Sequence, residues 1–194
     1  ISTGKAVYMT EGSTVNPLFG FASPNETIGN MQLKGGSLVV LTDERVGWYN
    51  LETEKLSSTA IRGFFAKSIG DRTAGLMEFR HPFVVDENLS VWLASKKLFF
   101  LGNDVSLKPY GMARIDVGGK IAYPFTAKNE TAAEKVKVEP MLALHERSNM
   151  LAMVMEDEIL LTDLEAGPQF SLSRKHLPIK SFYFTATPGK ILVQ

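Results

Sequence analysis

Three histidines and three acidic clusters are the residues in this sequence with the clearest capacity for chemistry. The histidines are His81, His145 and His176, which lie far apart in the chain. They show none of the short spacings at which zinc ligands usually occur. We therefore predict no histidine metal site, and we expect each imidazole to lie at the surface or to be partly packed. The sequence contains no cysteine, which excludes disulfides, thiolate ligands and a cysteine nucleophile.

The acidic clusters fall at predicted turns between strands, at residues 43–44, 86–87 and 156–158. Two neighbouring carboxylates can perform acid–base catalysis when their environments separate their pKa values. The tips of hairpins face solvent, where charged side chains are normally hydrated. We therefore expect solvated turn charges in these clusters and no catalytic pair.

Glycine motifs for nucleotide binding or acyl transfer are also missing. Gly118-Gly119-Lys120 lacks the upstream glycine and the following serine or threonine of a phosphate-binding loop. The sequence contains no Gly-x-Ser-x-Gly pattern, which would mark a nucleophile elbow. We predict a protein without enzymatic activity, with no catalytic, cofactor-binding or metal-binding residues.

Composition and charge narrow the class of protein further. The 194 residues include 21 basic and 21 acidic side chains, so the net charge is zero. The net charge therefore does not favour strong binding to nucleic acid or to an anionic membrane. The length fits one domain over residues 1–194, which could be a fragment of a larger chain. No apolar run approaches the roughly 20 residues that cross a bilayer, and we predict no membrane span.

The elements that would position these side chains are repeated hairpins. Residues 35–56 contain two short apolar runs, rich in β-branched and aromatic residues, around a polar turn, a pattern typical of a β-hairpin. The pattern returns at 90–101, with a predicted turn at 95–97, then at 150–167, and in shorter form at 181–193. Residues 38–42 are apolar on both faces of the predicted strand, as are 151–155, so we expect both strands to be buried on both sides.

The rest of the chain supplies shorter elements. We predict a strand at 4–9, a long loop at 10–30, and a hairpin that turns at Gly118 and Gly119, where glycine tolerates a positive φ. Residues 131–138 predict the only helix, with a capping box formed by Thr131 and Glu134. Aromatic residues in the apolar runs are expected to pack in the core, and they are Trp48, Trp92, Phe99, Phe100, Tyr183 and Phe184.

This pattern predicts an all-β fold of repeated antiparallel hairpins. Several short strands separated by turns are typical of a sandwich, a barrel or a propeller. The third hairpin closes on an acidic, glycine-containing turn at 162–167, which parallels residues 49–54. That closing turn favours a β-propeller-like fold of about four blades, with a β-sandwich as the alternative.

The order of these sequence segments along the chain resembles the order found in the propeller domain of tail proteins from short-tailed phages. The similar proteins are the tubular nozzle and the DNA-stabilisation (stopper) proteins below the portal. The resemblance covers about residues 30–194. It differs at Gly118 and Gly119, where the family usually has a helix, and at Thr162, where it often has an aromatic residue. The segments on which the resemblance rests are residues 30–33, 36–42, 46–50, 81–85, 98–103, 110–115 and 162–164.

The resemblance implies a structural tail component, with no catalytic residue to carry over. Such a protein would contact other protein subunits, form a homo-oligomeric ring around the DNA exit path, and allow non-specific passage of DNA. It would be located in the virion. The alternative from a different class is a cellular β-propeller, located in the cytoplasm, that binds a protein or peptide through loops held by the scaffold.

Overall fold

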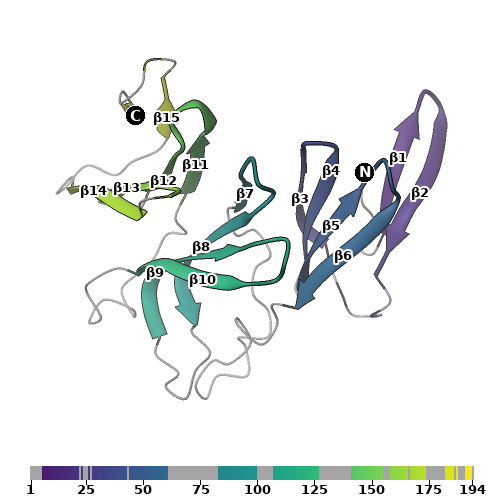
Figure 1. Ribbon diagram of the computed structural model, residues 1–194, viewed down its shortest axis with the longest axis horizontal. Helices are drawn as coiled ribbons and strands as arrows, with labels where there is room; N and C mark the ends of the chain where they lie inside the picture. Colours follow the sequence, from purple (N-terminus) through teal and green to yellow (C-terminus); the bar gives the residue numbers. More distant parts are fainter. Residues whose placement is uncertain are drawn as a thin grey trace. The chain divides into compact units, whose positions relative to one another are not determined.

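The computed structural model describes residues 6–21, 23, 26, 28–42, 44–60, 83–99, 107–126, 141–154, 158–165, 167–173, 182–185, 187 and 191–193. Strands dominate these residues, and the one helical segment among them is the 3-10 helix η3 at Glu146–Ser148. The prediction of an all-β fold is therefore confirmed (Figure 1). The predicted helix at 131–138 lies outside the described residues.

The described strands form antiparallel sheets, which we name A to E in chain order. Sheets B, C and D have four strands each, and each strand pairs with its neighbours in the sequence, while sheets A and E have two strands each. Sheet A contains β1 (Ala6–Glu11) and β2 (Thr14–Gly20); sheet B, β3 (Ile28–Lys34), β4 (Ser37–Thr42), β5 (Arg45–Asn50) and β6 (Lys55–Ala60); sheet C, β7 (Phe83–Val85), β8 (Val91–Phe99), β9 (Leu107–Ile115) and β10 (Ile121–Thr126); sheet D, β11 (Met141–His145), β12 (Met150–Val154), β13 (Glu158–Asp163) and β14 (Gly167–Ser173); sheet E, β15 (Phe182–Phe184) and β16 (Ile191–Val193).

The chain divides into two compact units. The first comprises residues 1–80 with 117–119, and the second comprises 81–116 with 120–194. Sheets A and B belong to the first unit. Apart from the β9–β10 turn, sheets C, D and E belong to the second. The single domain over residues 1–194 stays a prediction.

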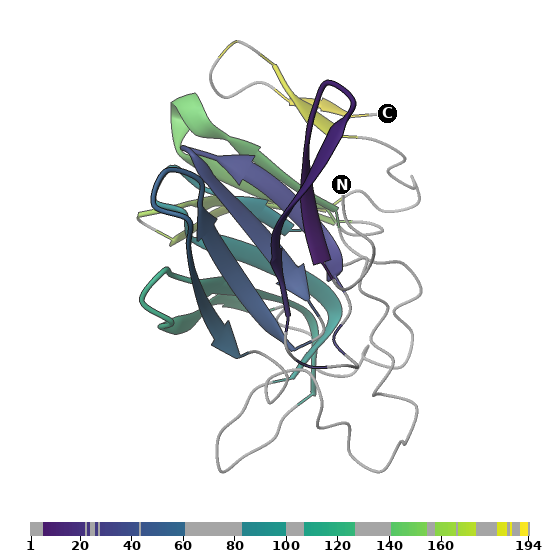
Figure 2. The ribbon, with the colours of Figure 1, turned by 90° about the vertical axis from the view of Figure 1, so that its right-hand side faces the viewer.

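In the first unit, the core centres on β4. Val39 and Val40 are fully buried although their side chains point to opposite faces of the strand. The predicted burial of this strand on both sides is confirmed. Sheet A packs on sheet B through Phe19, whose ring stacks on Tyr49 with centroids 4.8 Å apart. The β1–β2 hairpin that carries Phe19 is long and strongly twisted, as Figure 2 shows in purple.

In the second unit, sheet D is covered by a sheet on each face. One face of β12 packs against Trp92 of sheet C through Leu151 and Met153. Its other face packs against Phe182 of sheet E through Ala152 and Val154. All of these side chains are buried. Because β12 is apolar on both faces, the sequence requires two covering layers. The predicted burial is confirmed for residues 151–154, while Met155 lies outside the described residues.

A recurring turn marks the end of the third strand in sheets B, C and D. The side-chain oxygen of Asn50 accepts hydrogen bonds from the backbone N–H groups of Glu52 and Thr53. Asp116 and Asp163 occupy the same place after β9 and at the end of β13, and each accepts a backbone N–H from its own turn. Asn and Asp favour such turns because their side chains can cap the backbone locally. The parallel between residues 49–54 and 162–167 is therefore structural, and sheet C provides a third example.

The predicted second hairpin is wrong in its position. Residues 95–97 do not turn, because β8 runs without interruption from Val91 to Phe99 and pairs with β9 along its length. Ser95 and Lys97 lie opposite Gly111 and Pro109 in this ladder. Polar residues alone do not make a turn, and this segment contains no Gly, Pro, Asn or Asp to adopt turn dihedrals.

The predicted loop at 10–30 is also wrong, because β2 and the start of β3 fall within it. The chain turns at Gly12, with φ 57°, and returns along β1. Pro17 is tolerated in β2 because, among the described strands, β2 pairs with β1 alone, and a proline has its place on such an edge strand. The predicted strand at 4–9, the hairpin around Gly119 and the short hairpin at 181–193 correspond to β1, β9–β10 and β15–β16, and these predictions are confirmed.

Candidate functional site

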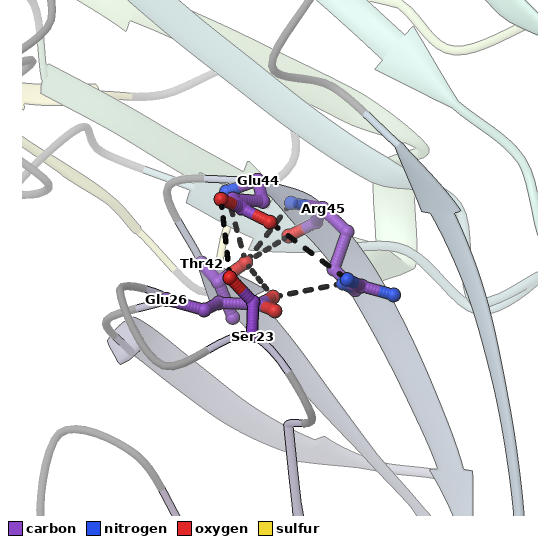
Figure 3. Close-up of polar contacts among 5 residues, drawn as sticks. All are labelled: Ser23, Glu26, Thr42, Glu44 and Arg45. Carbon is purple, nitrogen blue, oxygen red and sulfur yellow. Dashed lines mark hydrogen bonds and ion pairs between the residues drawn. The ribbon is translucent and has the colours of Figure 1, made fainter.

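A buried polar cluster surrounds Glu26, in the segment between β2 and β3 (Figure 3). The Glu26 side chain is fully buried. One carboxylate oxygen, Oε1, accepts hydrogen bonds from Thr42 Oγ1 at 2.6 Å and from Arg45 Nε at 2.8 Å. Thr42 ends β4 and Arg45 begins β5, so Glu26 fastens its own segment to the tip of that hairpin.

Thr42 organises the hairpin tip from the other side. Its hydroxyl oxygen accepts the backbone N–H groups of Glu44 at 3.1 Å and Arg45 at 2.9 Å while it donates to Glu26. The Arg45 guanidinium lies 5.7 Å from the centroid of the Phe21 ring. The hairpin tip is thus stabilised by the ion pair of Glu26 and Arg45, by the hydroxyl of Thr42, and by the contact of Arg45 with the Phe21 ring.

Glu44 lies at the edge of this network. Its Oε2 is 3.9 Å from the outer nitrogen of Arg45, and its Oε1 accepts a long hydrogen bond of 3.5 Å from Ser23. The predicted solvated charge describes Glu44 only in part, because the side chain retains just 17% of its exposure. Its neighbour Asp43 lies outside the described residues.

A second buried carboxylate, Asp86, connects β7 to β8. Its Oδ1 accepts the backbone N–H groups of Asn88 and Ser90, both at 2.9 Å, and its Oδ2 accepts the indole N–H of Trp92 at 2.9 Å. Asp86 is 3% exposed, so the prediction that this cluster carries only solvated turn charge is wrong for Asp86. The reason is that three donors replace water around its oxygens.

Arg114 completes this second cluster from the neighbouring strand. Its guanidinium lies 5.5 Å from the Trp92 ring, and a terminal nitrogen donates to Ser90 Oγ at 3.2 Å. Trp92 and Arg114 are opposite one another in the β8–β9 register, which places the cation over the aromatic face. The cluster fixes the Trp92 ring that packs against sheet D.

Neither carboxylate is arranged for catalysis. A general acid or base must reach a substrate proton directly or through one water molecule. Glu26 and Asp86 are buried, and the oxygens described above are engaged by donors from their own fold. Glu26 Oε2 has no hydrogen-bond partner among the described residues, but it is enclosed within the tip. The contacts of both carboxylates stabilise the local fold, because each one joins segments of the chain.

The remaining candidate residues do not form a common cluster, and several of them lie outside the described part of the chain. His145 ends β11, and its ring nitrogen Nδ1 hydrogen-bonds to Ser148 Oγ while the ring lies 5.2 Å from Phe184. This matches the expected partly packed imidazole. His81, His176, Glu156 and Asp157 lie outside the described residues, and Glu158 falls within β13. Among the residues described, no three His, Asp or Glu side chains are grouped to hold a metal ion.

The aromatic residues divide into buried and exposed sets. Trp48 and Trp92 are buried in the core as predicted. Tyr183 contradicts its prediction, because it points away from sheet D and is 60% exposed. Alternation along β15 explains the difference, since its neighbours Phe182 and Phe184 occupy the inward face. Phe100 and the side chain of Phe99 lie outside the described part of the chain.

Neither the protein-family models nor the curated proteins give this chain a relative. No protein-family model matches the chain. A search of curated proteins finds no matching sequence. In the described part of the chain, no helix has the length and apolar character needed to cross a membrane.

Sequence reasoning missed Glu26, which is the centre of one of the two buried polar clusters described above. The residue sits in a polar stretch without periodicity, and nothing in its neighbours indicates burial. The available signal was Thr42, because a threonine that closes an apolar strand before an acidic tip has a free hydroxyl for capping.

Proposed function

We propose that this chain is a non-enzymatic structural module built from repeated four-stranded sheets. The observation that carries the proposal is the repetition itself. Sheets B, C and D share one strand order and one Asx-capped turn after the third strand. Such repetition produces a rigid scaffold whose loops and faces serve for contact with partners.

The second unit supports a propeller-like arrangement of the repeats. Sheets C, D and E lie face to face. The first strand of sheet D, β11, lies beside β7 and β15, the first strands of its two neighbours, and the fourth strands β10 and β14 also lie near each other. Blades around a common axis place equivalent strands next to one another in this way. The β-propeller is accordingly the form we propose for the complete fold.

The particular role that we propose is a component of a phage tail, in a nozzle or adaptor that lines the path of DNA exit. The support is the resemblance of residues 30–194 to the nozzle and stopper proteins, together with the repeated sheets. The balanced charge of the chain, with 21 basic and 21 acidic residues, suits a wall along which DNA moves without being held. The location that follows is the virion, and the partners are other tail subunits.

Imaging of the particle tests this role. An antibody fragment or gold label directed to the chain should decorate the tail of the virion below the portal, in a symmetric ring. Portal and capsid genes should flank the coding gene. Flanking metabolic or trafficking genes and the absence of label from any particle would contradict the tail assignment, and would favour a cellular propeller that binds proteins.

A screen for turnover tests the non-enzymatic part of the proposal. The two buried carboxylates described above serve the fold, and we expect no hydrolase or lyase activity from the purified chain. Turnover that disappears on Glu26→Gln or Asp86→Asn, in variants whose circular dichroism and unfolding midpoint match those of the parent, would contradict the assignment.

A further inference from the structure

The contact between sheets C and D contains two buried polar atoms without partners. Thr162 is 0% exposed. Its Oγ1 and the Nε of Arg114 are both closed off from solvent, and neither atom has a hydrogen-bond partner among the described residues. Unsatisfied buried polar atoms are rare in folded proteins, so each one calls for a physical explanation.

Both atoms belong to the same contact. Arg114 is opposite Trp92 in the β8–β9 register, and Thr162 is opposite Leu151 in the β12–β13 register. Residues directly opposite one another share a face of their sheet. Trp92 and Leu151 belong to one buried cluster between the two sheets. Arg114 and Thr162 therefore lie on the faces that sheets C and D turn toward one another.

The other face of sheet D is covered differently. Ala152, Val154 and Ile159 pack against Phe182 of sheet E. Every member of that cluster is apolar, and none of the unsatisfied buried side-chain atoms among the described residues lies on that face. The strand β12 thus has one face in an apolar contact and the other face in a contact that contains two unsatisfied polar atoms.

These two atoms raise the free energy of the closed contact. A buried donor or acceptor without a partner costs the desolvation of that group, and the cost is larger for a charged group such as the guanidinium of Arg114. Separation of the two sheets returns both atoms to water and recovers that cost. The apolar packing around Trp92 opposes separation. The closed contact is therefore favoured, but by less than a wholly apolar contact of the same size would be.

We propose that the contact between sheets C and D is a joint at which the second unit opens locally. The two sheets part or slide there while the strand ladders within each sheet stay intact, and the polar atoms of Arg114 and Thr162 lower the cost of that opening. Shifts between packed layers are a common form of conformational change. The joint lets the angle between the two sheets change without unfolding of the chain. This inference does not depend on a role in a phage tail.

Thiol labelling under native conditions tests the joint. The chain has no cysteine, so one introduced thiol reports without background. Met153 is 0% exposed and lies in the cluster between sheets C and D, so Met153→Cys reacts only when that contact opens. Leu160→Cys probes the same cluster if Met153→Cys does not fold. We expect labelling that is faster than global unfolding permits and that depends only weakly on urea, because local opening exposes little surface.

Two substitutions at one position isolate the effect of the hydroxyl. Thr162→Val removes the hydroxyl and keeps the shape of the side chain, whereas Thr162→Ser keeps the hydroxyl. We expect Thr162→Val to slow the labelling of Met153→Cys about fivefold, and we expect no slowing from Thr162→Ser. Val154→Cys, on the face toward sheet E, is the control for location. Thr162→Val should change its labelling only as far as it changes global stability in urea unfolding.

Three outcomes overturn the inference. Labelling of Met153→Cys that follows global unfolding in both rate and urea dependence shows that the contact does not open locally. Equal labelling of Met153→Cys with Thr162→Val and with Thr162→Ser shows that the hydroxyl does not favour opening. A slowing of Val154→Cys that matches that of Met153→Cys and exceeds the change in global stability shows that the effect belongs to sheet D as a whole.

Discussion

Truncation of Val40 to alanine tests the assignment of β4 as the doubly covered core strand of sheet B. Val40 is 0% exposed. The substitution removes two methyl groups, and at about 0.8 kcal/mol for each buried carbon the lost transfer free energy is about 1.6 kcal/mol. Val39 is equally buried on the opposite face, so the strand has little freedom to move into the space. A residual cavity brings the expected loss to about 1–3 kcal/mol.

The assay is urea unfolding at one fixed protein concentration, because assembly would shift the midpoint by mass action. Val117→Ala is the matched control, since it removes the same atoms from a residue that is 42% exposed in the β9–β10 turn. We expect Val117→Ala to change the free energy of unfolding by no more than about 0.5 kcal/mol. If the control destabilises as much as Val40→Ala, the strand registers and the burial derived from them are wrong.

Four further substitutions separate the contributions of sheets C and D and the hairpin tip. Val154→Ala, at a residue 1% exposed in sheet D, should also cost about 1–3 kcal/mol in urea unfolding, and a neutral result would contradict the covering of that face by sheet E. Asp86→Ala leaves the indole N–H of Trp92 buried without its acceptor, and we expect a loss of about 2–4 kcal/mol; a loss below about 0.5 kcal/mol would show that Asp86 does not hold the ring. Thr162→Val replaces a buried hydroxyl that has no partner among the described residues, so thermal unfolding should show a neutral change or a gain of up to about 1 kcal/mol, and a clear loss would reveal a hidden partner. Glu44 lies at the edge of the hairpin tip, and its contacts with Ser23 and Arg45 are long, at 3.5 and 3.9 Å, so Glu44→Ala should stay within about 0.5 kcal/mol; a larger loss would make Glu44 part of the buried network.

The strands with both faces apolar were predictable from sequence, and physical chemistry explains why. Residues 38–42 and 151–154 are short apolar runs next to turn residues, and burial on two faces is the arrangement that removes both rows of side chains from water. Asn50 and Asp163 were also identifiable, because they follow such runs at corresponding places. The apolar runs and the turn residues after them depend on local composition, which can be read directly from the sequence.

The continuity of β8 and the role of Glu26 were not predictable in the same way. β8 continues through Lys97 because β9 supplies hydrogen-bond partners from residues that lie later in the chain. Glu26 is buried because Thr42 and Arg45 reach it from a different hairpin. Both depend on long-range pairing, which local propensity and periodicity do not encode. The inward and outward faces of β15 likewise follow from its contact with sheet D.

The oligomeric state of the purified chain tests the central claim most directly, which is that the repeated sheets form a structural module that assembles into a ring. Native mass spectrometry at micromolar concentration should give one dominant species whose mass is an integral multiple of the subunit mass. A parent chain that remains a monomer across the concentration range would contradict the claim.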